Sequence, residues 1–292
     1  MQDIFQTIEH REAEPMSKHT TFRIGGPADY FFIPKNANEI KLVLDYCRKI
    51  GMRYVILGNG SNMLFLDNGF QGAIIYICEN MNKISVDGNI LYAEAGALLS
   101  KIAATARDHS LTGMEFAAGI PGTVGGAVVM NAGAYGGEMK DIVKYVDVLE
   151  KDGNVRRYQG SEMQFGYRKS IIDKDRIVIG CGLELAHGER TLIEQEMKRL
   201  KEARCSKQPL EYPSAGSTFK RPEGYFAGKL IDDSGLRGYR VGGAMVSEKH
   251  CGFVINYDHA TAQDVIKLME DVKEIVYDKF QVVLEPEVRV IR

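Results

Sequence analysis

The chain has no long apolar run and no excess of charge of either sign. A membrane-spanning helix needs about 18 or more apolar residues in a row, and the 292-residue sequence offers no such run. Its 37 basic and 39 acidic residues leave a net charge of −2 without a basic stripe, so no nucleic-acid surface is indicated. The first fifteen residues contain acids and no apolar core, so we expect no secretory leader.

Cysteine is sparse, and metal-binding spacings are missing. The five cysteines include no pair at the CxxC spacing, and the six histidines form no HxxxH or HxxE pattern. Scattered cysteines of this kind are typical of reduced thiols in a cytoplasmic protein. The sequence therefore predicts neither a disulfide framework nor a metal site.

Glycine, in contrast, is concentrated in residues 119–138. Seven of these twenty residues are glycine, and the only charged residue is Glu138. Glycine accepts positive φ in tight turns, but each one adds to the conformational entropy lost on folding. We infer that another group approaches the backbone closely here.

A second glycine-rich stretch, residues 58–62, follows a predicted strand at 53–57. A dinucleotide-binding fingerprint would need a third glycine and a helix directly afterwards. Position 63 is methionine, and an Asp-Asn-Gly turn at 67–69 leaves no room for that helix. A P-loop is also excluded, because neither stretch is followed by the Gly-Lys-Ser/Thr sequence.

Both stretches remain candidates for loops that bind an anion through backbone N–H groups, since concave arrays of amides bind phosphate oxygens without lysine. The alternative is that both are only packing turns. The candidate residues are Gly58, Asn59, Gly60, Ser61, Asn62, Gly119, Ile120, Pro121, Gly122, Thr123, Gly125, Gly126 and Ala127.

Hydrophobic periodicity predicts an α+β fold with hairpins mixed among helices. Hairpins are expected around Asp87-Gly88 and Asp152-Gly153, and a last strand through residues 282–291. Helices are expected over 40–50, 98–109, 189–209 and 261–278, and the third should bury Leu192, Ile193, Met197 and Leu200. We place a domain boundary after residue 187, with residues 1–187 forming two subdomains that meet near residue 70 and residues 188–292 forming a second domain.

Six motifs occur in a fixed order: GNGSNML, GIPGTVGGAVVMNAGAYGGE, FGYRKS, SAGSTFK, AGKLID and LEPEVR. With them, the chain from TTFRIGG to the last residues resembles the UDP-N-acetylenolpyruvoylglucosamine reductase (MurB) family. The resemblance implies an FAD-binding fold of the vanillyl-alcohol-oxidase (PCMH) type in the N-terminal region. It also implies an α+β substrate-binding domain at the C-terminus, in the shorter form of the family that lacks an extra tyrosine-bearing loop.

The resemblance further implies an activity. Members use NADPH and non-covalently bound FAD to reduce UDP-N-acetylglucosamine enolpyruvate to UDP-N-acetylmuramate for peptidoglycan. We therefore expect a cytoplasmic enzyme, as a monomer, whose partner is this small-molecule substrate, without nucleic-acid binding or membrane insertion. Both glycine-rich loops are expected to hold the FAD.

Three catalytic residues carry over from the motifs. Ser217 in SAGSTF matches the proton donor to C2 of the substrate, and Arg168 in FGYRKS matches the arginine that pairs with its carboxylate. Glu287 in LEPEVR matches a glutamate that polarises the substrate, although Glu285 is close by. Read without the motifs, these residues are a turn serine, a surface ion pair and part of a solvated strand face.

Cations are expected around the substrate diphosphate, with Lys207, Lys220 and Lys229 as candidates. Arg221 stands where many relatives have asparagine, so no substrate contact is inferred there. Two other functions stay open: an FAD oxidoreductase of the same fold with another substrate, and a flavin- or nucleotide-sugar-binding protein without turnover. Ser217 and Arg168 in their motifs argue against the other-substrate alternative.

Overall fold

The computed structural model describes residues 4–292. Residues 1–3, which begin the predicted FAD-binding region, lie outside the described part. The chain divides into two compact units whose segments alternate along the sequence. The first contains the chain up to residue 11 and residues 31–59 and 73–204, and the second contains 12–30, 60–72 and 205–292. Most of helix α5 (Arg190–Lys207), which the sequence placed in the C-terminal domain, therefore belongs to the first unit.

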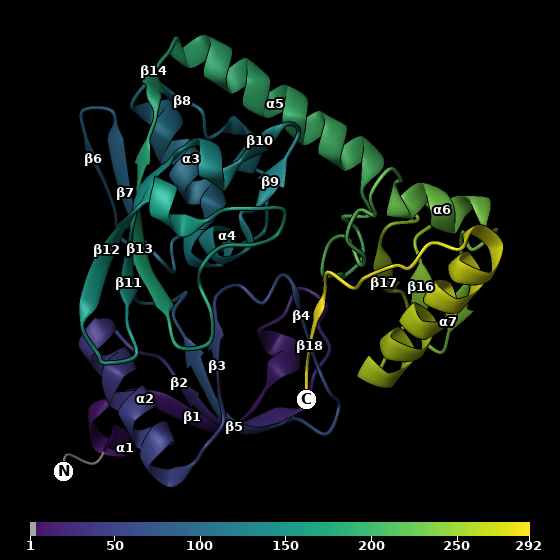
Figure 1. Cartoon of the computed structure of the whole chain (residues 1–292), viewed down its shortest axis with the longest axis horizontal. Coiled ribbons are helices and arrows are strands. Elements are labelled where there is room, and N and C mark those ends of the chain that lie inside the picture. Colours follow the sequence, from purple (N-terminus) through teal and green to yellow (C-terminus); the bar gives the residue numbers. More distant parts are fainter. Residues whose placement is uncertain (1–3) are drawn as a thin grey trace. The chain divides into compact units, whose positions relative to one another are not determined.

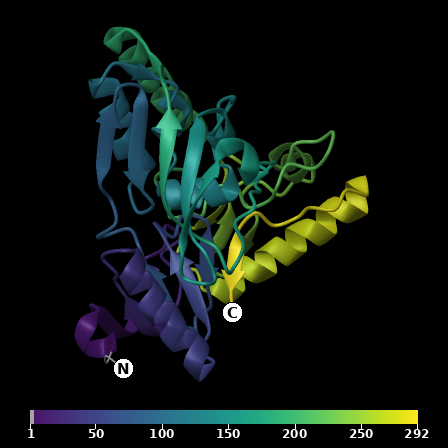
Figure 2. The same ribbon diagram turned by 60° about the vertical axis from the view of Figure 1, so that its left-hand side comes forward.

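An antiparallel five-stranded sheet with the order β12-β11-β13-β7-β6 is the largest sheet of the first unit (Figures 1 and 2). Both predicted hairpins belong to it and are confirmed. Gly88 and Gly153 have φ values of +57° and +86° at the two turns, a region that glycine adopts without strain. The strands are β6 (Ile84–Asp87), β7 (Ile90–Glu94), β11 (Val143–Leu149), β12 (Val155–Gln159) and β13 (Ile177–Glu184).

Two helices of the first unit follow from local signals, and a third was not predicted from the sequence. Helix α2 (Ala37–Ile50) begins where Asn36 accepts a hydrogen bond from the Glu39 N–H, and it ends at the left-handed Gly51. Helix α3 (Leu99–Asp108) buries Leu99, Ile102, Ala103 and Ala106, and the helices expected over 40–50 and 98–109 are confirmed. Helix α4 (Val124–Met130), which the sequence did not predict, begins inside the glycine-rich stretch and packs on β13 and β7.

The remaining short elements of the first unit are α1 (Ile4–Thr7), β3 (Tyr54–Leu57), β8 (Leu111–Thr112), β9 (Gly133–Ala134), β10 (Gly137–Glu138) and β14 (Ala186–His187). Strands β1 (His10–Pro15), β2 (Pro27–Phe32) and β5 (Phe70–Tyr76) contribute residues to both units, and the sheet order is β1-β2-β5-β3. Strands β3 and β5 pair in parallel. Four 3-10 turns lie at Met16–Lys18, Glu115–Ala117, Met139–Asp141 and Gly160–Met163.

One expectation for helix α5 is wrong. Ile193 and Leu200 are buried and Met197 is half-buried, but Leu192 is 61% exposed. Ile193 and Leu200 are seven residues apart and share a helix face, whereas Leu192 is rotated about 100° from Ile193. Leu192 therefore belongs to the solvated face of this charged helix.

The second unit is built around helix α7 (Ala262–Phe280), which packs on α6 (Ala227–Asp233) and on the sheet β15-β16-β17 (Figure 1). Helix α7 begins with a capping box: the Thr261 hydroxyl accepts from the Asp264 N–H at 3.1 Å, and the Asp264 carboxylate accepts from the Thr261 N–H at 2.9 Å. Buried apolar residues of α7 recur at helical spacing and form one core with residues from β4 and β16. The strands are β4 (Met63–Phe65), β15 (Arg240–Val241), β16 (Ala244–Val246), β17 (Val254–Asn256) and β18 (Arg289–Ile291).

The last strand is shorter than predicted. Only β18 is regular, and it pairs in parallel with β4. Proline cannot donate a ladder hydrogen bond, and Pro286 makes only an isolated bridge with Phe219. No helix within residues 4–292 combines the length and the apolar character that crossing a membrane requires. In the same residues, no three metal-ligating side chains come together.

Candidate active site

The first glycine-rich loop, residues 58–62, connects β3 to β4. The backbone N–H groups of its five residues donate to no protein acceptor in the described part of the chain. Gly60 has a φ of +59°, and a Cβ there would overlap the His19 carbonyl oxygen. A Cβ on Gly58 would overlap the Thr123 hydroxyl. The loop therefore keeps a run of N–H groups available for an anion, and side chains at these glycines would displace its backbone.

The second loop, residues 119–127, differs because many of its N–H groups are used inside the protein. The N–H groups of Val124 and Gly125 donate to the carbonyl oxygens of Ala97 and Ala95, both at 2.9 Å. A Cβ on Gly125 would lie 2.9 Å from the Ala95 Cβ and 3.0 Å from its carbonyl oxygen. From the sequence we inferred that another group lies close to the backbone here. At Gly125, that group is the protein's own backbone, at Ala95.

Gly126 is the glycine of this loop that the protein leaves uncovered. It is exposed, and a Cβ there would meet only the Thr123 Oγ1, at 3.7 Å. The side chain of Asn59 ties the two loops together, because its Nδ2 donates to the Pro121 carbonyl oxygen at 2.8 Å. Within the first unit, Gly58 and Asn59, whose N–H groups have no protein acceptor among residues 4–292, and the open Gly126 fit the diphosphate of FAD, which needs amide donors and close approach to backbone.

Arg168 lies at the tip of a tight turn in the first unit. Gly166 and Lys169 exchange backbone hydrogen bonds of 3.0 and 3.2 Å, which leaves Tyr167 and Arg168 as the two central residues. Arg168 has a φ of +55°, a conformation that costs energy for a residue other than glycine. Its guanidinium carbon is 5.1 Å from the centre of the Tyr167 ring. The fold thus holds this arginine in a specific, strained turn.

Ser217 and Glu287 lie on neighbouring segments of the second unit. The Glu287 N–H donates to the Thr218 carbonyl oxygen at 2.8 Å, so the backbones of residues 217–218 and 287 are adjacent. Gly216, with a φ of +76°, forms the turn that leads into Ser217, which is exposed. Asn62, from the first glycine-rich loop, donates from Nδ2 to the Glu287 carbonyl oxygen at 3.1 Å. Ser217, Glu287 and Asn62 are therefore brought together.

The neighbours of these residues have structural partners. Thr218 is 1% exposed, and its hydroxyl accepts from the Val254 N–H at 2.8 Å. Glu285 forms an ion pair of 3.0 Å with Lys220, while their backbones are joined by a 2.8 Å hydrogen bond. Glu285 is exposed and Glu287 is half-buried. The two glutamates that the sequence left hard to separate are thus in different environments.

The three candidate lysines belong to the second unit, where Lys207 and Lys229 are exposed and Lys220 is half-buried. Lys220 pairs with Glu285, and Lys229 pairs with Asp233 at 2.8 Å on helix α6. Lys207 is the last residue of α5. Arg221 stacks on Phe226, with its guanidinium carbon 4.0 Å from the ring centre, and so stabilises the turn before α6.

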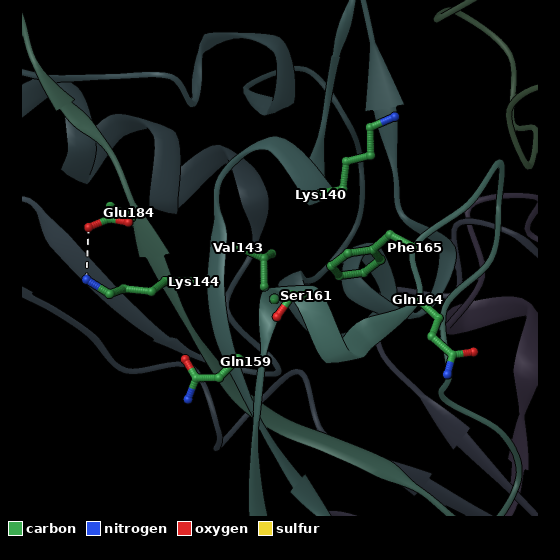
Figure 3. A pocket seen from close by; sticks show the side chains of 9 residues that line it. Lys140, Val143, Lys144, Gln159, Ser161, Gln164, Phe165 and Glu184 are labelled. Carbon is green, nitrogen blue, oxygen red and sulfur yellow. Dashed lines mark hydrogen bonds and ion pairs between the residues drawn. The ribbon is translucent and has the colours of Figure 1, made fainter.

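A shallow cavity of about 730 Å³ lies elsewhere in the first unit (Figure 3). No residue predicted to bind FAD or substrate lines it. Its two lysines are paired: Lys144 with Glu184 and Lys140 with Glu138, both at 2.8 Å. It is lined by Lys140, Val143, Lys144, Gln159, Gly160, Ser161, Gln164, Phe165 and Glu184.

Asn131, directly after helix α4, is a residue that the sequence did not single out. It is 1% exposed and follows helix α4 in the left-handed conformation, with a φ of +41°. A local signal for it exists, because Thr123, an apolar run and Asn131 have the spacing of a capped helix. The glycines inside that helix concealed the pattern.

Comparison with known proteins adds independent information. Residues 208–291 match the family model for the UDP-N-acetylenolpyruvoylglucosamine reductase C-terminal domain, and residues 28–159 match an FAD binding domain. The chain is 53% identical to the UDP-N-acetylenolpyruvoylglucosamine reductase of Lachnoclostridium phytofermentans, over 95% of this chain and 91% of that protein. It is 46% identical to the enzyme of the same name from Limosilactobacillus fermentum, over 98% and 96%.

A solved structure shows the same fold. The crystal structure of UDP-N-acetylenolpyruvylglucosamine reductase (MurB) from Thermus caldophilus superimposes with a TM-score of 0.84 at 36% identity. The alignment covers 98% of this chain and 99% of that one. The predicted α+β fold, with an FAD-binding domain and a family-specific C-terminal domain, is confirmed. This chain belongs to the UDP-N-acetylenolpyruvoylglucosamine reductase family.

Proposed function

We propose that the chain catalyses the NADPH-dependent, FAD-mediated reduction of UDP-N-acetylglucosamine enolpyruvate to UDP-N-acetylmuramate. The observation that carries the proposal is the adjacency of the Ser217 and Glu287 segments, where the Glu287 N–H donates to the Thr218 carbonyl oxygen at 2.8 Å. This reaction needs a proton donor and a polarising group at one substrate carbon, and two neighbouring backbone segments supply them.

The two glycine-rich loops would hold FAD, which would supply the hydride chemistry between NADPH and C3 of the enolpyruvyl group. The protein then has to stabilise the negative charge that develops at C2 and spreads into the carboxylate. Arg168 pairs with this carboxylate, for which a planar guanidinium fork is better suited than an ammonium group. Ser217 delivers the proton to C2, since a carbanion-like centre is basic enough to accept it from a hydroxyl. Glu287 helps to polarise the substrate.

The substrate's diphosphate needs positive charge, and Lys207, Lys220 and Lys229 are the proposed sources. Lys220 and Lys229 are held by exposed ion pairs with Glu285 and Asp233. Exposed pairs of this kind contribute little to stability. Exchange of a carboxylate partner for a phosphate therefore costs the protein little.

The product class places the reaction in peptidoglycan synthesis, and through it in cell-wall biogenesis, cell shape, the cell cycle and cell division. We propose that the enzyme acts in the cytoplasm, in keeping with its scattered cysteines, and as a monomer. Size-exclusion chromatography with light scattering of the purified protein tests the last point directly.

The proposed activity is tested by anaerobic mixing of the purified, FAD-loaded protein with its two substrates in turn. We expect NADPH to bleach the flavin absorbance and UDP-N-acetylglucosamine enolpyruvate to restore it. An oxidoreductase for another substrate would bleach with NADPH but stay bleached with this compound. A binding protein without turnover would not bleach at all.

FAD binding gives a separate prediction for Gly126, the uncovered glycine of the second loop. Gly126→Leu should lower FAD affinity by about tenfold or more, corresponding to about 1.4 kcal/mol, because its side chain enters space that the protein leaves open. FAD content after gel filtration and the fluorescence of released flavin measure the effect. Gly126→Ala is the matched control, since alanine favours the helix. Wild-type FAD affinity in Gly126→Leu would show that FAD does not bind against this glycine.

A further inference from the structure

The buried side chain of Asn131 joins three segments of the first unit. Its Nδ2 donates to the Glu138 carboxylate at 3.0 Å and to the Gly166 carbonyl oxygen at 3.1 Å. Its Oδ1 accepts from the Lys140 N–H at 2.9 Å. Both N–H groups of the amide and its oxygen are therefore used, and a buried amide that is so fully bonded has one preferred orientation.

Gly166 is the first residue of the turn that carries Arg168. A second hydrogen bond attaches the other side of this turn to the same helix, because the Ser170 hydroxyl donates to the Val129 carbonyl oxygen at 2.9 Å. The turn is therefore fixed at both ends to the C-terminal end of α4. The same helix begins at Val124, inside the second glycine-rich loop, residues 119–127.

The charges of Glu138, Lys140 and Arg168 favour the same arrangement. The hydrogen-bonded Lys140 ammonium lowers the pKa of Glu138 below its ordinary value, and the Asn131 amide and the Arg168 charge act in the same direction. Glu138 is therefore ionised at neutral pH and accepts from Asn131 as a carboxylate. The anion adds a favourable field at Arg168 without entering the turn itself.

We propose that Asn131 is a positioning residue for substrate binding: it fixes the strained turn that presents Arg168 relative to the loop at the start of α4. This inference rests on the proposed role of Arg168 toward the substrate carboxylate. Asn131 touches neither substrate nor FAD in this assignment and acts through the Gly166 carbonyl oxygen. Its left-handed φ and its three hydrogen bonds explain why a short amide side chain stands there.

The test uses two variants of the FAD-loaded enzyme. Asn131→Gly keeps the left-handed backbone and removes the three bonds, whereas Asn131→Asp keeps the shape but cannot donate to Gly166 or Glu138. In both, we expect the KM for UDP-N-acetylglucosamine enolpyruvate to rise about tenfold, as expected for a substrate-binding group that is no longer held in place. The rate of flavin reduction by NADPH and the FAD content should stay within about twofold of wild type, since neither depends on Arg168 in this scheme.

Val128→Ala, a core truncation in the same helix, is the control for lost stability. If it raises KM as much as the Asn131 variants at the same loss of Tm, Asn131 is only structural and the inference is overturned. A double-mutant cycle with Arg168→Ala completes the test: Asn131→Gly should add nothing in that background. An undiminished additional effect would show that Asn131 acts independently of Arg168.

Failure of the inference is distinguishable from failure of the proposed function. If Arg168→Ala slows the substrate step and both Asn131 variants leave KM unchanged, Asn131 has no positioning role while the role of Arg168 stands. If Arg168→Ala leaves the substrate step intact, the assigned role of Arg168 fails and the inference falls with it.

Discussion

Ser217→Ala is expected to lose about 10²- to 10⁴-fold in turnover, the usual contribution of a positioned general acid. The loss should fall on the reoxidation of reduced flavin by UDP-N-acetylglucosamine enolpyruvate, because reduction by NADPH needs no proton at C2. Substrate affinity should change little, since one exposed hydroxyl contributes modestly to binding a nucleotide sugar. Single-turnover reoxidation under anaerobic conditions measures the step.

Ser217→Cys should recover part of the rate, because a thiol also donates a proton. Ser214→Ala is the appropriate hydroxyl control. Thr218 is a poor one: its buried hydroxyl accepts from the Val254 N–H, and its removal leaves that donor unsatisfied at about 1–3 kcal/mol. A near wild-type rate of reoxidation in Ser217→Ala would show that another group is the acid.

Arg168→Lys should slow the same step by about 10²- to 10³-fold, comparable to removing one donor that stabilises a developing anion. Lysine keeps the charge but loses the two-point contact with a carboxylate. It also has to adopt the φ of +55° that the turn imposes, so the backbone strain is retained and does not explain a difference. Stopped-flow traces for the two half-reactions give the comparison.

Lys169→Arg, which leaves Arg168 in place, is a matched control at the neighbouring exposed position of the turn. It should leave both half-reactions within about twofold of wild type, as substitutions on exposed surface usually do. Equal slowing of both half-reactions in Arg168→Lys would mean that Arg168 stabilises the fold and has no separate role toward the substrate.

Local patterns in the sequence were sufficient for most regular elements and for the family. The capping box of α7, the left-handed glycine after α2 and the two glycine turns depend on residues within four positions of each other, so their chemistry is visible without a fold. Ser217, Arg168 and Glu287 were identified by the motifs around them, and their roles remain predictions. Helix α4 was missed because its glycines lower helix propensity, and packing on β13 and β7 overrides that.

By itself, the sequence determined the α+β class, the hairpins, the glycine-rich loops and the resemblance to one reductase family. Tertiary structure alone decided what each glycine does: Gly125 accommodates Ala95, thirty residues away, while Gly126 stays open. It also decided that Leu192 faces solvent and that Asn131 reaches Gly166, 35 residues along the chain. The physical reason is that periodicity, caps and turns are short-range effects, whereas close backbone contacts and buried polar bonds depend on which distant segments the fold brings together.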